Sequence, residues 1–209
     1  MSQGMMKGRK NQVMNEIIVS IKPEWIKKIA DGEKTIEVRK SAPKDVPFKA
    51  YIYASSSGTW SLCFDWSEDA WEKVCLTANC RSKEISAKNY NLEIVSGYIV
   101  GEFICDKVIT VDCDSVAPFD RDTGDYIDKE TQLSRDDLWA YTHGKCAYGW
   151  HITELVIYDK PKKLSEFYKK CNGHCFSGCP YYRGKDEDCD KPVFTRPPQS
   201  WCYTEKREY

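Results

Sequence analysis

Residues 32–39 have the sequence Gly-Glu-Lys-Thr-Ile-Glu-Val-Arg and mark a change of periodicity in the chain. The residues before them, 23–31, begin with proline and repeat apolar side chains at helical spacing, namely Trp25, Ile26 and Ile29. This pattern predicts a short amphipathic helix, and Gly32 supplies the left-handed residue that ends it. From Thr35 onward apolar and polar residues alternate, which predicts a strand with one core face and one polar face.

Three charged residues of this stretch, Lys34, Glu37 and Arg39, lie within one turn and one strand. Arg39 can form a forked pair with a carboxylate or phosphate, and Lys34, which we expect at an exposed turn, can act as a point charge. An ionised Glu37 would keep Lys34 protonated, which suits electrostatic binding better than general-base chemistry. Glu37 would then be the better base, or an acceptor for an exocyclic amine. The residues alone leave a second interpretation open, a surface ion pair between Glu37 and Arg39.

The rest of the chain alternates between predicted strands and short helices. Apolar runs predict strands at residues 15–21, 48–54, 96–112 and 147–158. Serine caps followed by acidic residues predict helices at residues 67–76 and 134–142. Together these elements predict an α+β fold.

The 32–39 stretch resembles the GxKxxExR motif of the ASCH family, a branch of the PUA-like β-barrels, with Gly32, Lys34, Glu37 and Arg39 at the four motif positions. Three further segments are similar to a branch common in bacteria and their phages: the strand that starts at Gly97, residues 148–152 (Tyr-Gly-Trp-His-Ile) and residues 196–203 (Arg-Pro-Pro-Gln-Ser-Trp-Cys-Tyr). The resemblance covers roughly residues 15–203. It implies a PUA-like pseudo-barrel of five or six strands with flanking helices.

The resemblance implies a protein that binds RNA or a modified nucleotide or nucleoside in a cleft around this motif. The ligand-binding residues would be Lys22, Lys34, Glu37 and Arg39. The resemblance also permits a hydrolase, because one branch of the family is an amidohydrolase of acetylated cytidine and others resemble ribonucleases. Lys34 and Glu37 are then the candidate catalytic residues. The chain departs from the amidohydrolase pattern, because Glu37 stands where that branch has its nucleophilic threonine, and Thr35 is a poor substitute.

Three polar residues outside the motif have two interpretations each. Lys22 lies at a strand-to-helix junction, where it either points a cation at a ligand beside the helix N-terminus or is solvated. Glu102 interrupts an apolar strand and either faces solvent or lies in a cleft with a raised pKa. His151 lies inside a predicted strand, where a structural hydrogen bond is commoner than a catalytic role.

Changes of composition divide the chain. We expect residues 1–14 to be a disordered lead, residues 15–165 to form the barrel, and residues 166–209 to form a cysteine-rich extension packed on it. Residues 55–96 are expected to be an insertion in the barrel. Its three tryptophans either stack on bases or pack a small satellite core: Trp60, Trp66 and Trp71. Exposed apolar patches there would favour a third function, a protein-interaction adaptor.

The composition limits the function further. A chain of 209 residues with 41% hydrophobic content is long enough for one well-buried core. A net charge of −1 argues against the broad cationic face of a nonspecific DNA binder, although it permits a local basic cleft. No apolar run approaches membrane length, and the first 14 residues lack a hydrophobic signal core. We therefore expect a soluble, cytoplasmic protein without membrane contact.

The chain has 11 cysteines, and in a reducing compartment these favour metal binding or buried thiols over disulfides. Four of them lie in a glycine-rich segment with few aliphatic residues: Cys171, Cys175, Cys179 and Cys189. A tetrahedral zinc would supply the stability that such a segment lacks. The spacing departs from the usual CxxC pair, so reduced cysteines packed under the C-terminal tail are the alternative. The zinc would be structural, and we expect no organic cofactor.

Overall fold

The chain has an α+β fold built on one large sheet. A computed structural model describes residues 14–56, 59–78, 91–112, 116–170 and 193–206. The strands of the large sheet are β1 (Asn15–Ile21), β2 (Ile36–Arg39), β3 (Phe48–Ala54), β7 (Ile99–Asp112), β8 (Phe119–Asp120), β9 (Ala147–Lys162), β10 (Phe167–Lys169) and β11 (Trp201–Lys206).

The strand order is β10-β11-β1-β3-β7-β9-β2, and β8 pairs with β7 beside this path. Strands β1 and β3 are parallel, whereas the other neighbours along the path are antiparallel. The strands predicted at residues 15–21, from Thr35 to Arg39, and at 48–54, 96–112 and 147–158 correspond to β1, β2, β3, β7 and β9, whereas β11 was not predicted as a strand. The prediction of an α+β fold is confirmed, and the sheet is an open path that ends at β10 and β2.

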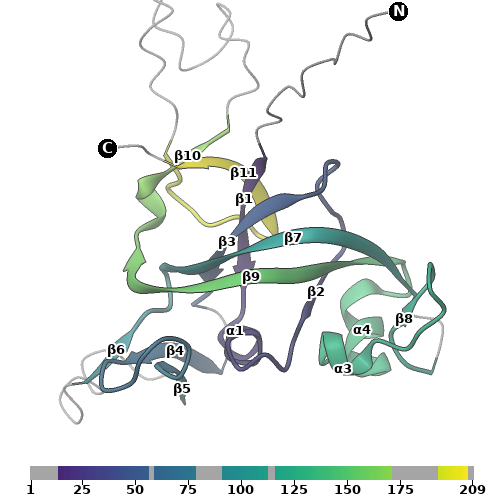
Figure 1. Ribbon diagram of the computed structural model, residues 1–209, viewed down its shortest axis with the longest axis horizontal. Coiled ribbons are helices and arrows are strands. Elements are labelled where there is room, and N and C mark those ends of the chain that lie inside the picture. Colours follow the sequence, from purple (N-terminus) through teal and green to yellow (C-terminus); the bar gives the residue numbers. More distant parts are fainter. Residues whose placement is uncertain (1–13, 57–58, 79–90, 113–115, 171–192, 207–209) are drawn as a thin grey trace, which may run out of the picture.

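Short helices flank the sheet: α1 (Pro23–Ala30), α3 (Asp128–Thr131), α4 (Arg135–Thr142) and the 3-10 turn η1 (Leu164–Glu166). Helix α1 begins at a proline and is followed by Gly32 at φ +74°, as the sequence predicts. Helix α4 begins with a capping box between Ser134 and Asp137. Figure 1 shows α1 beneath the large sheet, with α3 and α4 on one side of it and a small second sheet on the other.

The small second sheet has the order β5-β4-β6 and consists of β4 (Trp60–Asp65), β5 (Val74–Ala78) and β6 (Leu92–Ile94). The helix predicted at residues 67–76 is wrong. The side chain of Asp65 accepts hydrogen bonds from Ser67, which favours a turn there, and the residues from Val74 pair with β4 instead.

The two sheets and α1 share one core rather than forming two. Leu62 and Phe64 of β4 and Val74 of β5 are buried in the same apolar cluster as Ile26 of α1 and Phe103 of β7. The predicted satellite core is therefore part of the main core. The three tryptophans of this region are half-exposed instead of central to the packing, at 41–47% for Trp60, Trp66 and Trp71.

The C-terminal residues contribute to the large sheet. Strand β11 pairs with β1, and β10 pairs with β11, so residues far apart in the sequence lie side by side (Figure 1). The candidate zinc ligands Cys171, Cys175, Cys179 and Cys189 lie outside the described residues, as do residues 1–13. The zinc site and the expected domain division therefore stay predictions.

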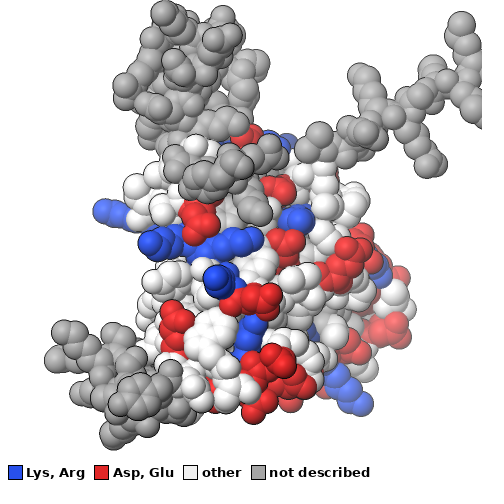
Figure 2. Space-filling view, turned by 60° about the vertical axis from the view of Figure 1, so that its left-hand side comes forward, with Lys and Arg blue, Asp and Glu red and all other residues white. Residues whose placement is uncertain are grey.

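Two surface properties bear on function. No helix of the described segments has both the length and the apolar content to cross a membrane. On the face in Figure 2, basic and acidic side chains are interspersed, and no broad cationic field forms there. A ligand that depends on positive charge would therefore need a local concentration of it.

Candidate functional site

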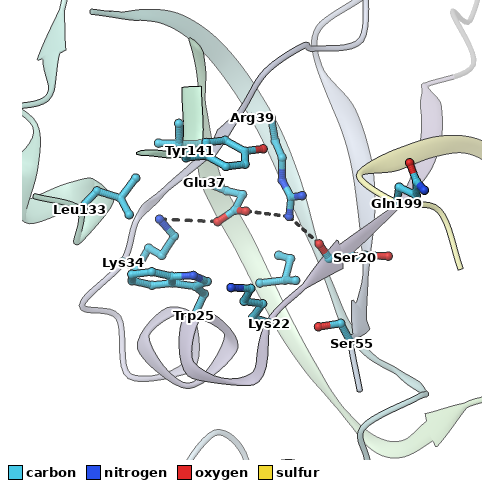
Figure 3. A pocket seen from close by; sticks show the side chains of 12 residues that line it. Ser20, Lys22, Trp25, Lys34, Glu37, Arg39, Ser55, Leu133, Tyr141 and Gln199 are labelled. Carbon is cyan, nitrogen blue, oxygen red and sulfur yellow. Dashed lines mark hydrogen bonds and ion pairs between the residues drawn. The ribbon is translucent and has the colours of Figure 1, made fainter. Parts of the chain in front are cut away.

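A pocket of about 340 Å³ opens beside the N-terminus of α1 and the strand β2. Its lining comes from β1, α1, β2, α4 and five connecting segments, and comprises Ser20, Ile21, Lys22, Trp25, Lys34, Glu37, Val38, Arg39, Ser55, Leu133, Tyr141 and Gln199. All four predicted ligand-binding residues, Lys22, Lys34, Glu37 and Arg39, are in this lining. Figure 3 shows the charged side chains gathered around Glu37.

The backbone around residue 35 fixes the position of these side chains. Thr35 donates its amide to the Glu130 carbonyl at 2.9 Å and accepts a hydrogen bond from the Ile152 amide at 2.9 Å. Strand β2 then pairs with β9, with Glu37 opposite Trp150 and Arg39 opposite Tyr148. The charged side chains therefore project from a segment that is hydrogen-bonded to α3 at Thr35 and to β9 along β2.

Glu37 is the centre of the charged cluster. Its Oε1 lies 2.8 Å from Arg39 Nη2, and its Oε2 lies 3.6 Å from Lys34 Nζ. The three side chains are 2–9% exposed, so water screens these interactions little. The interpretation of Glu37 and Arg39 as a surface ion pair is wrong, because the pair is buried.

Lys34 was expected at an exposed turn, and this expectation is wrong. The residue is 3% exposed, and its Nζ donates a hydrogen bond to the Thr131 carbonyl at 2.5 Å. The ammonium also lies 5.3 Å from the centre of the Trp25 ring, within the range of a cation–π contact. The short helix α3 supplies the Thr131 carbonyl, and the sequence around Lys34 carries no signal of that contact.

The two cations of the cluster have different surroundings. Burial lowers the pKa of the Lys34 ammonium below its ordinary value, and the attraction of Glu37 opposes this only in part. The sequence-based expectation that an ionised Glu37 keeps Lys34 protonated did not include this larger effect of burial. Arg39 donates from Nη2 to the Ser20 carbonyl at 2.7 Å, and its buried Nε has no partner among the described residues.

Two aromatic residues complete one end of the pocket. Trp25 lies on α1, and the sequence pattern assigned it only to the apolar face of that helix. Tyr141 lies at the end of α4, and burial raises the pKa of its hydroxyl. Lys40 lies 4.9 Å from the centre of the Tyr141 ring. No local pattern predicted Tyr141, because it reaches the pocket through the packing of α4 against β2.

Gln199 and Ser20 line the opposite end of the pocket (Figure 3). Ser20 donates from Oγ to the Pro198 carbonyl at 2.6 Å and from its amide to the Ser200 carbonyl at 2.9 Å. The segment before β11 is thereby fixed at the rim of the pocket. Gln199 belongs to the 196–203 segment on which the family resemblance partly rests, and that was the only sequence signal for it.

A second charged cluster lies on the other face of the large sheet. Glu102 of β7 receives hydrogen bonds from Lys49 Nζ at 3.0 Å and from the Tyr158 hydroxyl. Burial by itself would raise the pKa of Glu102, but the hydrogen bonds from Tyr158 and Lys49 outweigh it and lower the pKa. The alternative of a cleft carboxyl with a raised pKa is therefore wrong.

His151 is hydrogen-bonded, as the structural interpretation holds. Its Nδ1 lies 2.7 Å from Asp106 Oδ1, and both side chains are about half-exposed. The hydrogen bond with His151 lowers the pKa of Asp106. Neither residue lines the pocket.

No family model matches the sequence, and no curated protein matches it. Among solved structures, the chain is similar to the crystal structure of ASCH from Zymomonas mobilis, with a TM-score of 0.49 and 16% identity over 92% of this chain and 89% of that one. The structures of two point mutants of the same protein match at 15% identity over 92% of this chain. Their TM-scores are 0.49 and 0.48, and the match covers 92% and 90% of their own lengths.

Proposed function

We propose that this protein binds RNA or a modified nucleotide, and that the pocket beside α1 holds the base. The observation that carries the proposal is the lining of that pocket, which combines three cations and one carboxylate with an indole ring: Lys22, Lys34, Arg39, Glu37 and Trp25. The chain as a whole has a net charge of −1, so this excess of cations is local.

Each part of this lining suits one part of a nucleotide. An indole provides a stacking surface for a heterocycle of any sequence, since every base has a π face. A carboxylate held by Lys34 and Arg39 is a fixed acceptor for an exocyclic amine, and the cations favour a phosphate. The volume of about 340 Å³ is in the range of small-molecule sites. The GxKxxExR resemblance points to the same ligand class.

The test compares the substitution of a tryptophan inside the pocket with that of a tryptophan outside it. Binding of short labelled RNA and of a panel of modified nucleosides and nucleotides, including acetylated cytidine, is measured for the protein, for Trp25→Leu and for Trp71→Leu. Trp71 is 47% exposed and does not line the pocket. We expect Trp25→Leu to weaken binding about tenfold, the size of one stacked base, and Trp71→Leu to leave it unchanged.

The opposite results have definite meanings. Equal losses in both variants would place the ligand on the tryptophan-rich small sheet and contradict the pocket assignment. Failure of every RNA, nucleotide and nucleoside to bind would overturn the proposed function. If the protein then bound a protein partner and Trp71→Leu abolished that binding, the result would favour an adaptor function.

A hydrolase is the second candidate, and the lowered pKa of Lys34 favours it. An ammonium whose pKa is lowered gives up its proton more readily, here beside a carboxylate. Against this, the Lys34 Nζ already donates to the Thr131 carbonyl, and Thr35 is not in the pocket lining. Chromatography of the same incubations tests the candidate. New products formed by the protein and absent with Lys34→Met would support hydrolysis.

A further inference from the structure

The pocket has two chemically different ends. In Figure 3, Trp25, Lys34, Leu133 and Tyr141 lie on one side of Glu37, and Ser20, Ser55 and Gln199 lie on the other. The first end is apolar and aromatic around its one buried lysine. The second end is polar, and its lining contains hydroxyl and amide groups but no aromatic ring.

The charges of the aromatic end have partners within the protein. Lys34 Nζ donates to the Thr131 carbonyl at 2.5 Å and lies 3.6 Å from Glu37. Glu37 in turn receives Arg39 at 2.8 Å. A second anion beside Lys34 would have to compete with Glu37 for the ammonium, so this end is better suited to a neutral ring.

Arg39 lies between the two ends of the pocket and has more N–H donors than its contacts with Glu37 and Ser20 use. The residue is 7% exposed, and its Nη2 is shared between Glu37 and the Ser20 carbonyl. Its Nε has no hydrogen-bond partner among the described residues. A guanidinium has five N–H donors, and a buried donor without an acceptor is costly. Glu37 carries one negative charge, whereas Lys34 and Arg39 carry two positive charges when both are protonated. A negatively charged ligand oxygen in the pocket beside Arg39 would compensate the positive charge that remains.

Lys22 adds a second cation at this end. It lies at the N-cap position of α1, where the helix dipole also favours an anion. None of the ion pairs of the described residues includes Lys22. Its side chain lines the pocket, so its charge is available to a ligand.

The segment that carries Gln199 closes this end and is held in place. The hydrogen bonds from Ser20 to the Pro198 and Ser200 carbonyls, at 2.6 and 2.9 Å, fix the residues on both sides of Gln199. Because Ser20 also accepts from Arg39 through its carbonyl, the guanidinium and the segment are tied to one residue. The backbone on both sides of Gln199 is therefore fixed at the rim, and its exposed side-chain amide can donate to a bound anion.

We infer that the end of the pocket formed by Lys22, Arg39 and Gln199 is a subsite for a phosphate monoester, carried by a mononucleotide or by the terminal nucleotide of an RNA strand. This inference rests on the proposed function and refines it. The ring of the ligand lies at the Trp25 end, and its phosphate lies beside Arg39. The site then distinguishes a nucleotide from its nucleoside.

The experiment measures dissociation constants for cytidine, cytidine 5′-monophosphate and cytidine 3′-monophosphate, and for a short RNA with and without a 5′-phosphate. The protein is compared with Lys22→Gln, Gln199→Ala and the matched control Lys27→Gln. Lys27 lies on the same helix but pairs with Asp31 and does not line the pocket. Inorganic phosphate is used as a competitor.

We expect one of the monophosphates to bind about tenfold more tightly than cytidine, the size of one charge-assisted contact. Lys22→Gln should remove most of this preference, Gln199→Ala should reduce it less, and Lys27→Gln, which lies outside the pocket, should preserve both the preference and the affinity for cytidine. A preference for the 5′-phosphorylated RNA would identify an RNA terminus as the source, whereas a preference for the mononucleotide alone would identify a free nucleotide.

Equal affinities for cytidine and both monophosphates would overturn the subsite and leave the base-binding function intact. A loss in Lys22→Gln that is the same for cytidine and for its monophosphates would overturn it as well. Absence of binding by every nucleoside, nucleotide and RNA would instead overturn the proposed function itself.

Discussion

Two glutamates of the large sheet each lie between two donor side chains, but they differ in exposure and in the charge of those donors. Glu37 on β2 lies between Lys34 and Arg39, and its side chain is 7% exposed. Glu102 on β7 lies between Lys49 and the Tyr158 hydroxyl, and its side chain is 22% exposed. Glu102 has one cation and one neutral donor, whereas Glu37 has two cations.

The difference separates a carboxylate whose charge is balanced within the protein from one that lies in an excess of positive charge. Around Glu102 the hydrogen bonds suffice to lower the pKa of the carboxyl, so donors within the protein stabilise its ionised form. Around Glu37 burial lowers the pKa of Lys34, and Arg39 Nε has no hydrogen-bond partner in the part of the chain that the structure describes. Excess positive charge beside a cavity is costly without a ligand, and we take such an excess as the mark of a site.

The largest expected effect follows from removing each carboxylate in turn. Glu37→Gln leaves Lys34 and Arg39 buried without a counter-charge, and we expect it to lower the free energy of unfolding by about 3 kcal/mol. Glu102→Gln leaves the better-exposed Lys49 without its partner and is expected to cost about 1 kcal/mol. Denaturant titration of both variants at pH 7, with comparison of midpoints and slopes, measures the difference.

The pair of variants is its own control, because each replaces a glutamate on the large sheet with an amide of the same shape. Equal losses in Glu37→Gln and Glu102→Gln would show that burial and the second cation make no difference. In that case the contrast between the two clusters would not separate a site from a structural contact.

Much of the fold could be predicted from local patterns. The strand at residues 48–54 and the first strand at residues 15–21 match β3 and β1, because unbroken apolar runs suit strands buried on both faces. The failure at residues 67–76 has a physical reason. A serine followed by acidic residues also suits a turn, and pairing of β5 with β4 outweighed the local helical preference.

The site could be predicted only where its residues lie close together in the sequence. Lys34, Glu37 and Arg39 share one strand and turn, so their convergence was apparent from spacing. The burial of Lys34 was not, since it depends on the Thr131 carbonyl from a helix about a hundred residues later, at a sequence separation of 97. Tyr141 and Gln199 likewise reach the pocket through tertiary packing alone.

The second prediction separates the packing of Lys34 from its charge. Lys34→Ala removes a side chain that is buried against Trp25, and it leaves the Thr131 carbonyl without its donor. We expect it to lower the free energy of unfolding by about 2 kcal/mol. Lys34→Met loses the same donor, but it keeps the volume and removes a charge that burial disfavours, so it should cost only about 1 kcal/mol.

Thermal and denaturant unfolding of the two Lys34 variants measure this difference. A loss in Lys34→Met as large as that in Lys34→Ala would show that the ammonium itself holds α3 against β2. The Glu37 cluster would then resemble the Glu102 cluster in being structural.

The smallest expected effect is the pH dependence of the Glu102 cluster. The pKa of Glu102 is lower in the fold than the ordinary value of 4.5, so the unfolded chain binds the proton more readily. Glu102 therefore stabilises the fold at neutral pH, and this stabilisation is lost as the pH falls below about 4.5 and through the folded pKa. The stability difference of about 1 kcal/mol between the protein and Glu102→Gln should be full at pH 7 and should shrink in acid.

Denaturant titrations of both proteins between pH 7 and pH 3 measure that difference, and an NMR titration of the Glu102 carboxyl carbon measures the pKa directly. Tyr158→Phe is the matched variant, because it removes one of the two hydrogen bonds that lower the pKa and keeps the ring in place. It should move the Glu102 pKa upward. A Glu102 pKa that stays the same in Tyr158→Phe would contradict the view that internal donors satisfy this carboxylate. The contrast with Glu37 would then depend on burial alone.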